Sequence, residues 1–336
     1  SEVYTRQAFH RSVVAVAALL AVAAVLVGML AGDTWVLLGD VVNWLNGNTG
    51  PAYTFVLDQR WPRVAAALLS GAALAVAGTT VQAVCRNPLA EPGILGITAG
   101  AGLGAVSLLT FVPLAGVWAV SGVAGLGAVL AFALVYGLAW RGGLSSDRLV
   151  LIGFGAWQGG LALITFLIVS YDPWNTGKAL TWLSGSTYGR TATQVLPVAI
   201  ALLVLTPAVV AARRELDLLA LDDDTPRVLG VRLERTRLLA LGAAALLTST
   251  AVSAVGVIGF VGLVAPHIAR ALVGGRHTRV LPVAALLGAL LVSVADTLGR
   301  TVIAPAQIPA GLVIAMIGTP YFVWLLWRSR ATEASR

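Results

Sequence analysis

The chain consists of long uncharged, apolar runs separated by short clusters of charged residues. A helix needs about 20 consecutive apolar residues to cross the hydrocarbon of a membrane. Five runs each fit one crossing, the last expected to enter near Ile308: 12–32, 64–85, 149–171, 191–212 and 301–327. The pattern therefore predicts an all-α, polytopic membrane protein.

Two further regions add helices to this pattern. The run 92–140 is too long for one span and is broken at Pro113, which predicts helices at about 94–111 and 116–140. The run 280–299 predicts another span, with Asp296 near its end.

The run 238–269 is ambiguous, because it is long for one span and short for two. If it breaks around Gly256 and Gly259 and the second helix ends near Val273, 17 of the 22 lysines and arginines fall on one side. A single span would leave 12 of them there. Because lysine and arginine are enriched in cytoplasmic segments, we predict about ten transmembrane helices with both termini cytoplasmic.

Two segments are then expected on the outer side. The segment 33–59 carries Trp35, Trp44 and Tyr53, which is typical of a loop at the membrane interface. The segment 172–190 contains LTWLSGSTYG, which we interpret as a short helix folded back over the mouth of a pathway.

The segment 213–237 is the most polar part of the chain and holds 12 of its 37 charged residues. Asp222, Asp223 and Asp224 precede Thr225-Pro226, and Gly230 follows, a pattern that predicts a short capped helix over 224–229. Such an isolated helix suggests a docking element, although an ordinary solvated loop is the alternative.

Composition supports the membrane assignment. Hydrophobic residues make up 58% of the 336 and charged residues 11%, against roughly 25% charged in soluble domains. The net charge of +7 does not indicate nucleic-acid binding, because the arginines stand at the ends of apolar runs. Cys85 is the only cysteine, which excludes an intramolecular disulfide.

The sequence argues against an enzyme. No HExxH zinc motif is present, and the only lysine, Lys178, lies outside any phosphate-binding GxxxxGK[ST] loop. We therefore expect no cofactor in this chain, and any ATP hydrolysis must come from a partner.

An ion-coupled secondary transporter is the stronger rival class, because ionisable groups within a membrane often mark ion pathways. Asp296 and Arg300 stand four residues apart and are expected to pair with each other. Gln82 either lines a polar pathway or bonds to a neighbouring helix, and the sequence leaves both open.

Several stretches resemble one family, the FecCD permeases, which are membrane subunits of ATP-binding-cassette (ABC) importers for iron siderophores, haem and cobalamin. The chain is also similar to the cobalamin importer permease. The matching stretches cover most of the chain in the family's order: 60–105, 219–231, 256–274, 281–300 and 308–326.

The resemblance implies a single permease domain over 1–336 with the type II ABC importer permease fold. It also implies a second permease subunit, identical or related, two cytoplasmic ATPases that bind ATP and Mg, and an extracytoplasmic substrate-binding protein. The segment 213–237 would be the cytoplasmic coupling loop, although Asp222 and Pro226 depart from the family's usual glycine and small residue. Its coupling residues would be Asp222, Asp223, Asp224, Arg227, Val228, Leu229 and Gly230.

Two more groups of residues match functional positions of the family. Asn87, Leu89, Ser145 and Ser146 would form the cytoplasmic gate, with a simple helix cap at Asn87-Pro88 as the alternative. Arg60, Arg63 and Arg300 would receive acidic side chains of the binding protein, with anchoring to lipid headgroups as the alternative. The expected cargo is an iron siderophore, with haem and cobalamin left open.

Overall fold

The computed structural model describes residues 2–141, 143, 145–171 and 183–333, and every regular element in these ranges is a helix. The first half of the chain contains α1 (Glu2–Leu30), α2 (Leu38–Leu45), α3 (Pro51–Cys85), η1 (Pro92–Leu95), α4 (Ile97–Phe111), α5 (Val117–Ala139) and α6 (Ser146–Tyr171). The second half contains α8 (Ala192–Ala211), α9 (Arg213–Leu219), α10 (Asp224–Val228), α11 (Leu233–Val255), α12 (Val261–Val273), α13 (His277–Thr301) and α14 (Ala310–Glu333).

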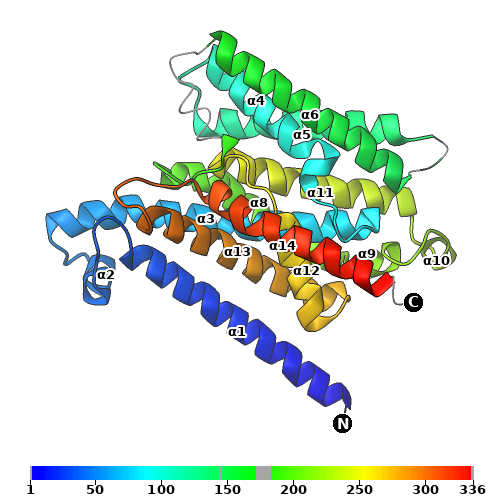
Figure 1. The fold of residues 1–336 in the computed structure, drawn as a ribbon, viewed down its shortest axis with the longest axis horizontal. Coiled ribbons are helices and arrows are strands. Elements are labelled where there is room, and N and C mark those ends of the chain that lie inside the picture. Colours follow the sequence, from blue (N-terminus) through cyan, green and yellow to red (C-terminus); the bar gives the residue numbers. More distant parts are fainter. Residues whose placement is uncertain (1, 142, 144, 172–182, 334–336) are drawn as a thin grey trace.

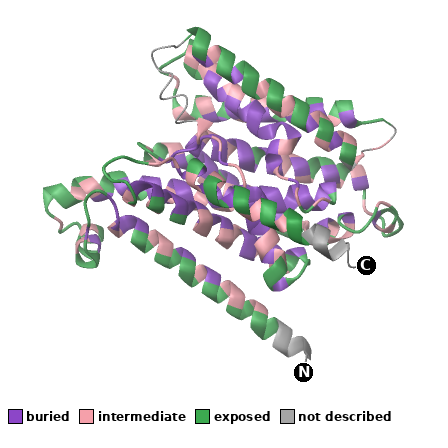
Figure 2. Ribbon diagram, in the orientation of Figure 1, coloured by how far each residue is buried: buried purple, intermediate pink, exposed green. Residues whose placement is uncertain are grey.

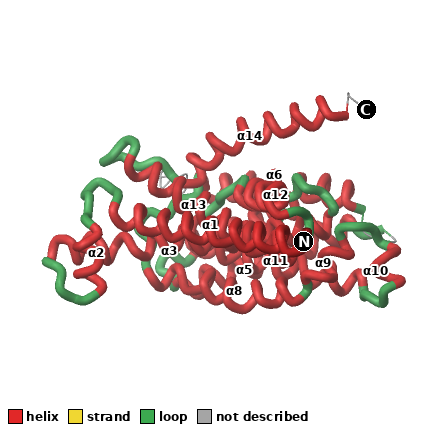
Figure 3. The backbone as a smooth tube through the Cα atoms, turned by 90° about the horizontal axis from the view of Figure 1, so that it is seen from below, coloured by secondary structure: helices red, strands yellow, loops and turns green. Residues whose placement is uncertain are grey.

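The helices surround α3, which packs against α8, α11, α12 and α13 and is itself mostly buried (Figure 1). Helices α4, α5 and α6 form a layer along one edge, and α1 lies along the opposite edge against α13. Buried positions concentrate in α3, α11 and α13, whereas α1 and α6 expose long outer faces (Figure 2). Helix α14 contacts the bundle through its first half and extends away from it toward its C-terminal end (Figure 3).

The predicted order of membrane helices is confirmed. Eight described helices are long and apolar enough to cross a membrane, and the shorter α4 and α12 bring the number to ten. The chain breaks between α4 and α5 at 112–116, beside Pro113, and between α11 and α12 at 256–260. The second break begins at Gly256 with φ +75°, a conformation that favours glycine.

Three local predictions are corrected. Helix α3 begins at Pro51 rather than at residue 64, and α2 occupies part of the segment that we expected to be an interfacial loop. The polar segment 213–237 contains α9 as well as α10, and α11 begins at Leu233 instead of 238. The short helix predicted within 172–190 falls partly on 172–182, which lie outside the described residues, and 185–190 are turn and loop.

Close packing of α3 depends on glycine. A Cβ atom at Gly78 would lie 2.0 Å from the backbone oxygen of Gly262 in α12, and one at Gly71 would lie 2.2 Å from the oxygen of Gly288 in α13. Because backbone oxygens cannot move without displacing their helices, these contacts admit no side chain. Small residues of this kind let membrane helices approach closely.

We expect Gly78→Val to destabilise the permease by about 1–3 kcal/mol or more, because the added atoms force α3 and α12 apart. Gly242→Val in α11 is the matched control, since no atom lies within 4 Å of a Cβ there. Thermal unfolding of both variants in detergent measures the difference. Equal unfolding temperatures would contradict the packing account.

Candidate functional site

Helix α10 protrudes from one end of the bundle (Figure 1) and is held by the cap that the sequence predicted. The backbone N–H and the hydroxyl of Thr225 donate to the two carboxylate oxygens of Asp222, at 2.6 and 2.8 Å. These hydrogen bonds lower the pKa of the exposed Asp222 carboxyl. Pro226 is buried in the first turn, and Gly230 ends the helix with φ +79°.

An exposed apolar tip distinguishes α10 from an ordinary solvated loop. Val228 is 84% exposed and Leu229 63%, and Leu221 just before the helix is 66% exposed. Large apolar side chains gathered at the end of a short polar helix are typical of a surface that another protein covers. We call Leu221, Val228 and Leu229 the apolar tip.

Asp223 does not cap the helix, contrary to the predicted role of the acidic triplet. Its Oδ1 atom accepts hydrogen bonds from Arg86 Nη2 at 2.5 Å and from Arg237 Nη2 at 2.6 Å. Arg237 is only 2% exposed and also contacts Glu234, which accepts a hydrogen bond from Tyr136 in α5. The N-terminus of α10 is therefore tied to α3, α5 and α11.

The remaining coupling residues lie on the surface. Arg227 contacts Asp224 at 3.7 Å, with side chains 57% and 94% exposed. An exposed ion pair of this kind contributes little to stability. Both side chains are accessible to a partner.

The predicted gate residues lie in two segments. Asn87 and Leu89 lie between α3 and η1, and Ser145 and Ser146 lie at the start of α6. Asn87 Oδ1 accepts a hydrogen bond from the Leu89 N–H at 2.9 Å, so Asn87 organises the turn after α3. Ser145 precedes Ser146, the first residue of α6, and its carbonyl accepts from the Leu149 N–H. Both assignments to a gate stay predictions, because a single chain does not test them.

The structure supports the helix-bridging alternative for Gln82. The residue is 3% exposed, its amide nitrogen donates to the Gly262 carbonyl at 3.2 Å, and its amide oxygen accepts from Arg270. Both partners belong to α12. Gln82 thus joins α3 to α12, and its role in a pathway stays a prediction.

At the opposite end of the bundle, Asp296 is the centre of a buried ionic network. Arg63 donates to Asp296 Oδ1 through two nitrogens, at 3.0 and 3.1 Å, and Thr187 also donates to that oxygen. Arg300 Nε lies 3.3 Å from Oδ2, which confirms the predicted pair. Asp296 is 1% exposed and has two cationic partners instead of the single one expected.

Arg60 and Arg300 also hold the end of α1. Arg60 donates to the Met29 carbonyl at 2.8 Å, and Arg300 donates to the carbonyls of Gly28 and Ala31 at 3.0 and 3.2 Å. The last carbonyls of a helix lack partners within the helix and carry partial negative charge. The two arginines therefore satisfy the C-terminus of α1.

These contacts bear on the predicted docking role of Arg60, Arg63 and Arg300. The three residues are 5–8% exposed, and most of their donors are engaged within the chain. In this structure they are therefore neither free docking groups nor anchors to lipid headgroups. They do line an open hollow of about 640 Å³ together with Tyr188, Gln307 and other residues. Docking of a partner at this hollow stays a prediction.

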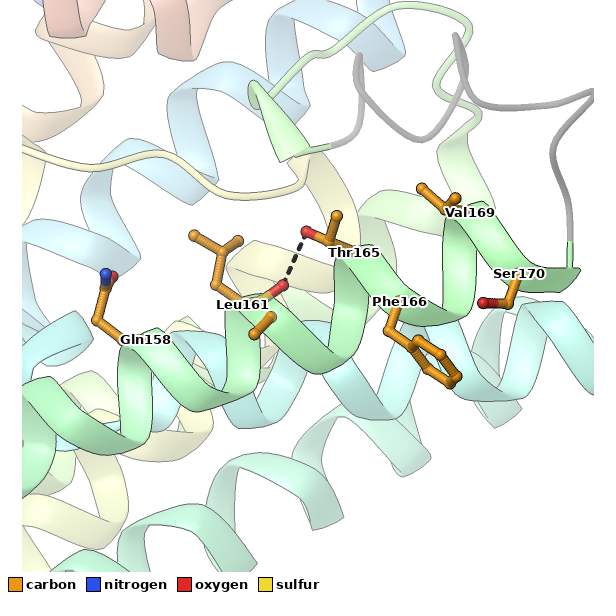
Figure 4. A pocket seen from close by; sticks show the side chains of 7 residues that line it. Gln158, Leu161, Thr165, Phe166, Val169 and Ser170 are labelled. Carbon is orange, nitrogen blue, oxygen red and sulfur yellow. Dashed lines mark hydrogen bonds between the residues drawn. The ribbon is translucent and has the colours of Figure 1, made fainter.

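A further candidate surface runs along α6 (Figure 4). Seven residues spaced three or four apart line a shallow hollow of about 600 Å³: Gln158, Leu161, Ala162, Thr165, Phe166, Val169 and Ser170. All are exposed, whereas Ile164 and Ile168 on the other face are buried. Thr165 donates its hydroxyl to the Leu161 carbonyl at 2.9 Å, whereas the amide of Gln158 is costly against lipid, so this face is suited to water or a second subunit.

Sequence reasoning missed this α6 face, the ionic partners of Asp223 and the second partner of Asp296, Arg63. The available signal was the presence of three polar residues, Gln158, Thr165 and Ser170, within one uncharged run. For the ionic partners there was none, because Arg63 and Asp296 are separated by 233 residues and Arg86 and Asp223 by 137.

Comparisons with known proteins identify relatives over nearly the whole chain. The model of the FecCD transport family matches residues 19–328. The iron-uptake system permease protein FeuC of Bacillus subtilis is 39% identical over 84% of this chain and 87% of its own length. The Fe(3+) dicitrate transport system permease protein FecD of Escherichia coli is 41% identical over 83% of this chain and 86% of its own length.

The fold has a solved counterpart. A structure described as an inward-facing conformation of a metal-chelate type ABC transporter matches with a TM-score of 0.82 and 27% identity, covering 95% of this chain and 99% of that chain. The helix order, the layer of α4–α6 and the short α12 thus belong to a known permease architecture.

Proposed function

The chain belongs to the FecCD transport family, and we propose that it is the permease subunit of an ABC importer that carries an iron–siderophore complex across the cell membrane. The family match over residues 19–328 carries this proposal. The relatives named above are permeases for iron uptake and ferric dicitrate, which favours a ferric chelate as the cargo.

The complex consists of two permease subunits, two ABC ATPases and an extracytoplasmic binding protein. ATP and Mg bind to the ATPases, and this chain carries no cofactor. The apolar tip of α10 inserts into a cleft of an ATPase, because Val228 and Leu229 are otherwise exposed to water without cover from the described residues. Neither a nucleic acid nor a reaction on the cargo is involved.

The pathway lies between the two permease subunits, which are identical or related. The α6 face supplies one wall of it, because Gln158, Thr165 and Ser170 stand exposed on a membrane helix. The bundle around α3 is closely packed through glycine contacts among the described residues, which favours a pathway between subunits over one through this bundle.

The α10 end of the bundle faces the cytoplasm, as do both termini. The arginine-rich segments 213–237 and 270–279 lie at this end, in agreement with the positive-inside rule. The α2 end, with the hollow beside Arg60 and Arg63, then faces outward, where the binding protein delivers the cargo.

The buried ionic network argues against an ion-coupled secondary transporter. A proton- or ion-coupling carboxylate must exchange its partner during transport. Asp296 is the one acid within a described long membrane helix that is almost fully buried, and it is held by Arg63, Arg300 and Thr187. Its structural role argues against Asp296 as the coupling group of such a mechanism.

Uptake of labelled cargo by cells with and without this chain tests the proposed substrate. Radiolabelled ferric siderophores, haem and cobalamin are offered separately to a deletion strain and to the same strain carrying the chain. We expect accumulation of a ferric siderophore to depend on the chain, while cobalamin and haem uptake do not change. Restoration of haem or cobalamin uptake alone would contradict the siderophore assignment and leave the importer assignment intact.

A further inference from the structure

We propose that a chain of five side chains, Tyr136, Glu234, Arg237, Asp223 and Arg86, transmits movement of α10 to both predicted gate segments. The inference rests on the proposed importer function and assigns residues that position the gate. The chain starts at α10, which an ATPase would move, and it reaches the ends of both α3 and α5. Three steps support it.

The first limb joins α10 to the end of α3. Arg86 Nη2 donates to Asp223 Oδ1 at 2.5 Å, and Asp223 directly precedes α10. Arg86 directly follows α3 and adopts a left-handed conformation with φ +51°, uncommon for a residue with a side chain. The next residues are Asn87 and Leu89 of the predicted gate, so a shift of Asp223 pulls on the turn that orients them.

The second limb joins α10 to α5 through α11. Asp223 Oδ1 also accepts from Arg237 Nη2 at 2.6 Å, and Arg237 Nη1 lies 3.3 Å from Glu234. The other oxygen of Glu234 accepts the Tyr136 hydroxyl at 3.0 Å. Tyr136 stacks on Trp140 directly after α5, with ring centroids 6.0 Å apart, and Trp140 precedes Ser145 by five residues in the sequence.

Burial of Arg237 distinguishes the second limb from a loose surface pair, whereas in the first limb the Arg86 and Asp223 side chains are 30% and 33% exposed. Arg237 is 2% exposed and relies on Asp223 and Glu234 to compensate its charge, so a shift of Asp223 weakens that compensation where water does not reach. A single carboxylate oxygen shared by two guanidinium groups fixes Arg86 and Arg237 relative to α10. The neighbouring pair Asp224–Arg227 is the contrast, because both side chains are more than half exposed.

Asp222 and Asp223 make different contacts, which agrees with a connecting role for Asp223. Asp222 caps the helix through Thr225, which leaves the Asp223 carboxylate free to point toward the bundle. If α10 needed only a stable N-terminus, Asp222 would suffice. Asp223 adds the contacts that couple the helix to the membrane-spanning body.

Gate accessibility in the assembled complex tests the proposal. The parent carries Cys85→Ala with Leu89→Cys as a reporter, and its reaction rate with a soluble thiol reagent is measured without nucleotide and with ATP plus vanadate. Arg86→Gln removes the first limb, and Tyr136→Phe with a Ser145→Cys reporter tests the second. Arg235→Gln on the exposed side of α11 is the control for loss of a positive charge.

We expect the nucleotide-dependent ratio of reaction rates to fall at least about fivefold in Arg86→Gln, the lower range of typical coupling between sites. ATPase association should not change, because Arg86 lies outside the apolar tip, and Arg235→Gln should behave as the parent. A merely structural role for Arg86 would alter folding but would not remove the nucleotide response of the folded complex.

The possible outcomes distinguish failure of the connection, of the gate position and of the importer function. If the parent responds to nucleotide and Arg86→Gln responds equally, the connection is wrong and the importer function stands. If the parent transports cargo but Leu89→Cys never responds, the gate position and the connection both fall. If the parent neither responds nor transports, the proposed function itself fails.

Discussion

Asp296→Ala is expected to lower the free energy of unfolding by about 3–5 kcal/mol, because removing one partner of a buried ion pair leaves uncompensated charge. The change strands Arg63 and Arg300, which are 8% and 5% exposed. It also frees Thr187 and loosens the arginine contacts that hold the end of α1. Chemical unfolding of the purified permease in detergent measures the effect.

Asp33→Ala is the matched control. Asp33 lies 3.8 Å from Arg60, but its side chain is 67% exposed. An exposed pair contributes about 0–1 kcal/mol, so this variant should unfold almost as the parent does. The account of Asp296 as the centre of a structural network would be wrong if both variants had similar stability.

Replacing Val228 and Leu229 together by aspartate is expected to reduce ATP-driven uptake by at least about 30-fold. The loss of one central anchor of a protein interface typically costs 2 kcal/mol or more, which corresponds to that factor. The variant should still insert into the membrane, because both side chains already face water. Uptake and co-purification of the ATPase with the permease are the two measurements.

Leu37 and Leu45 provide the control at the other end of the bundle. They are 75% and 71% exposed beside and within α2, so replacing both by aspartate makes the same chemical change far from α10. ATPase association should be preserved in that variant. Normal uptake by the Val228→Asp, Leu229→Asp variant would remove the coupling role of α10.

The spans could be predicted from sequence because hydrocarbon thickness and charge placement act over single runs of residues. The extension of α3 back to Pro51 could not, since Asp58, Arg60 and Arg63 read as the charged flank of a span. Two of these charges are buried by partners that lie far away in sequence. Arg63 donates hydrogen bonds to Asp296 and Gln307, and Arg60 donates one to the end of α1.

The segment around α10 likewise combines features that are local in sequence with contacts to residues far away in sequence. Its caps and its apolar tip are local patterns, so 222–230 predicted a helix that the structure contains. The role of Asp223 depends on Arg86 and Arg237, which reach it only after α3 and α11 have packed. Likewise, the docking prediction for Arg60, Arg63 and Arg300 followed from their position at span ends, whereas folding engages them internally.

ATP-dependent import into proteoliposomes tests the central claim most directly. The vesicles contain this chain with its permease partner and ATPases, and the binding protein is loaded with a radiolabelled ferric siderophore. We predict accumulation of label that requires ATP and Mg and persists after ion gradients are collapsed. Accumulation that follows an ion gradient and ignores ATP would contradict the account.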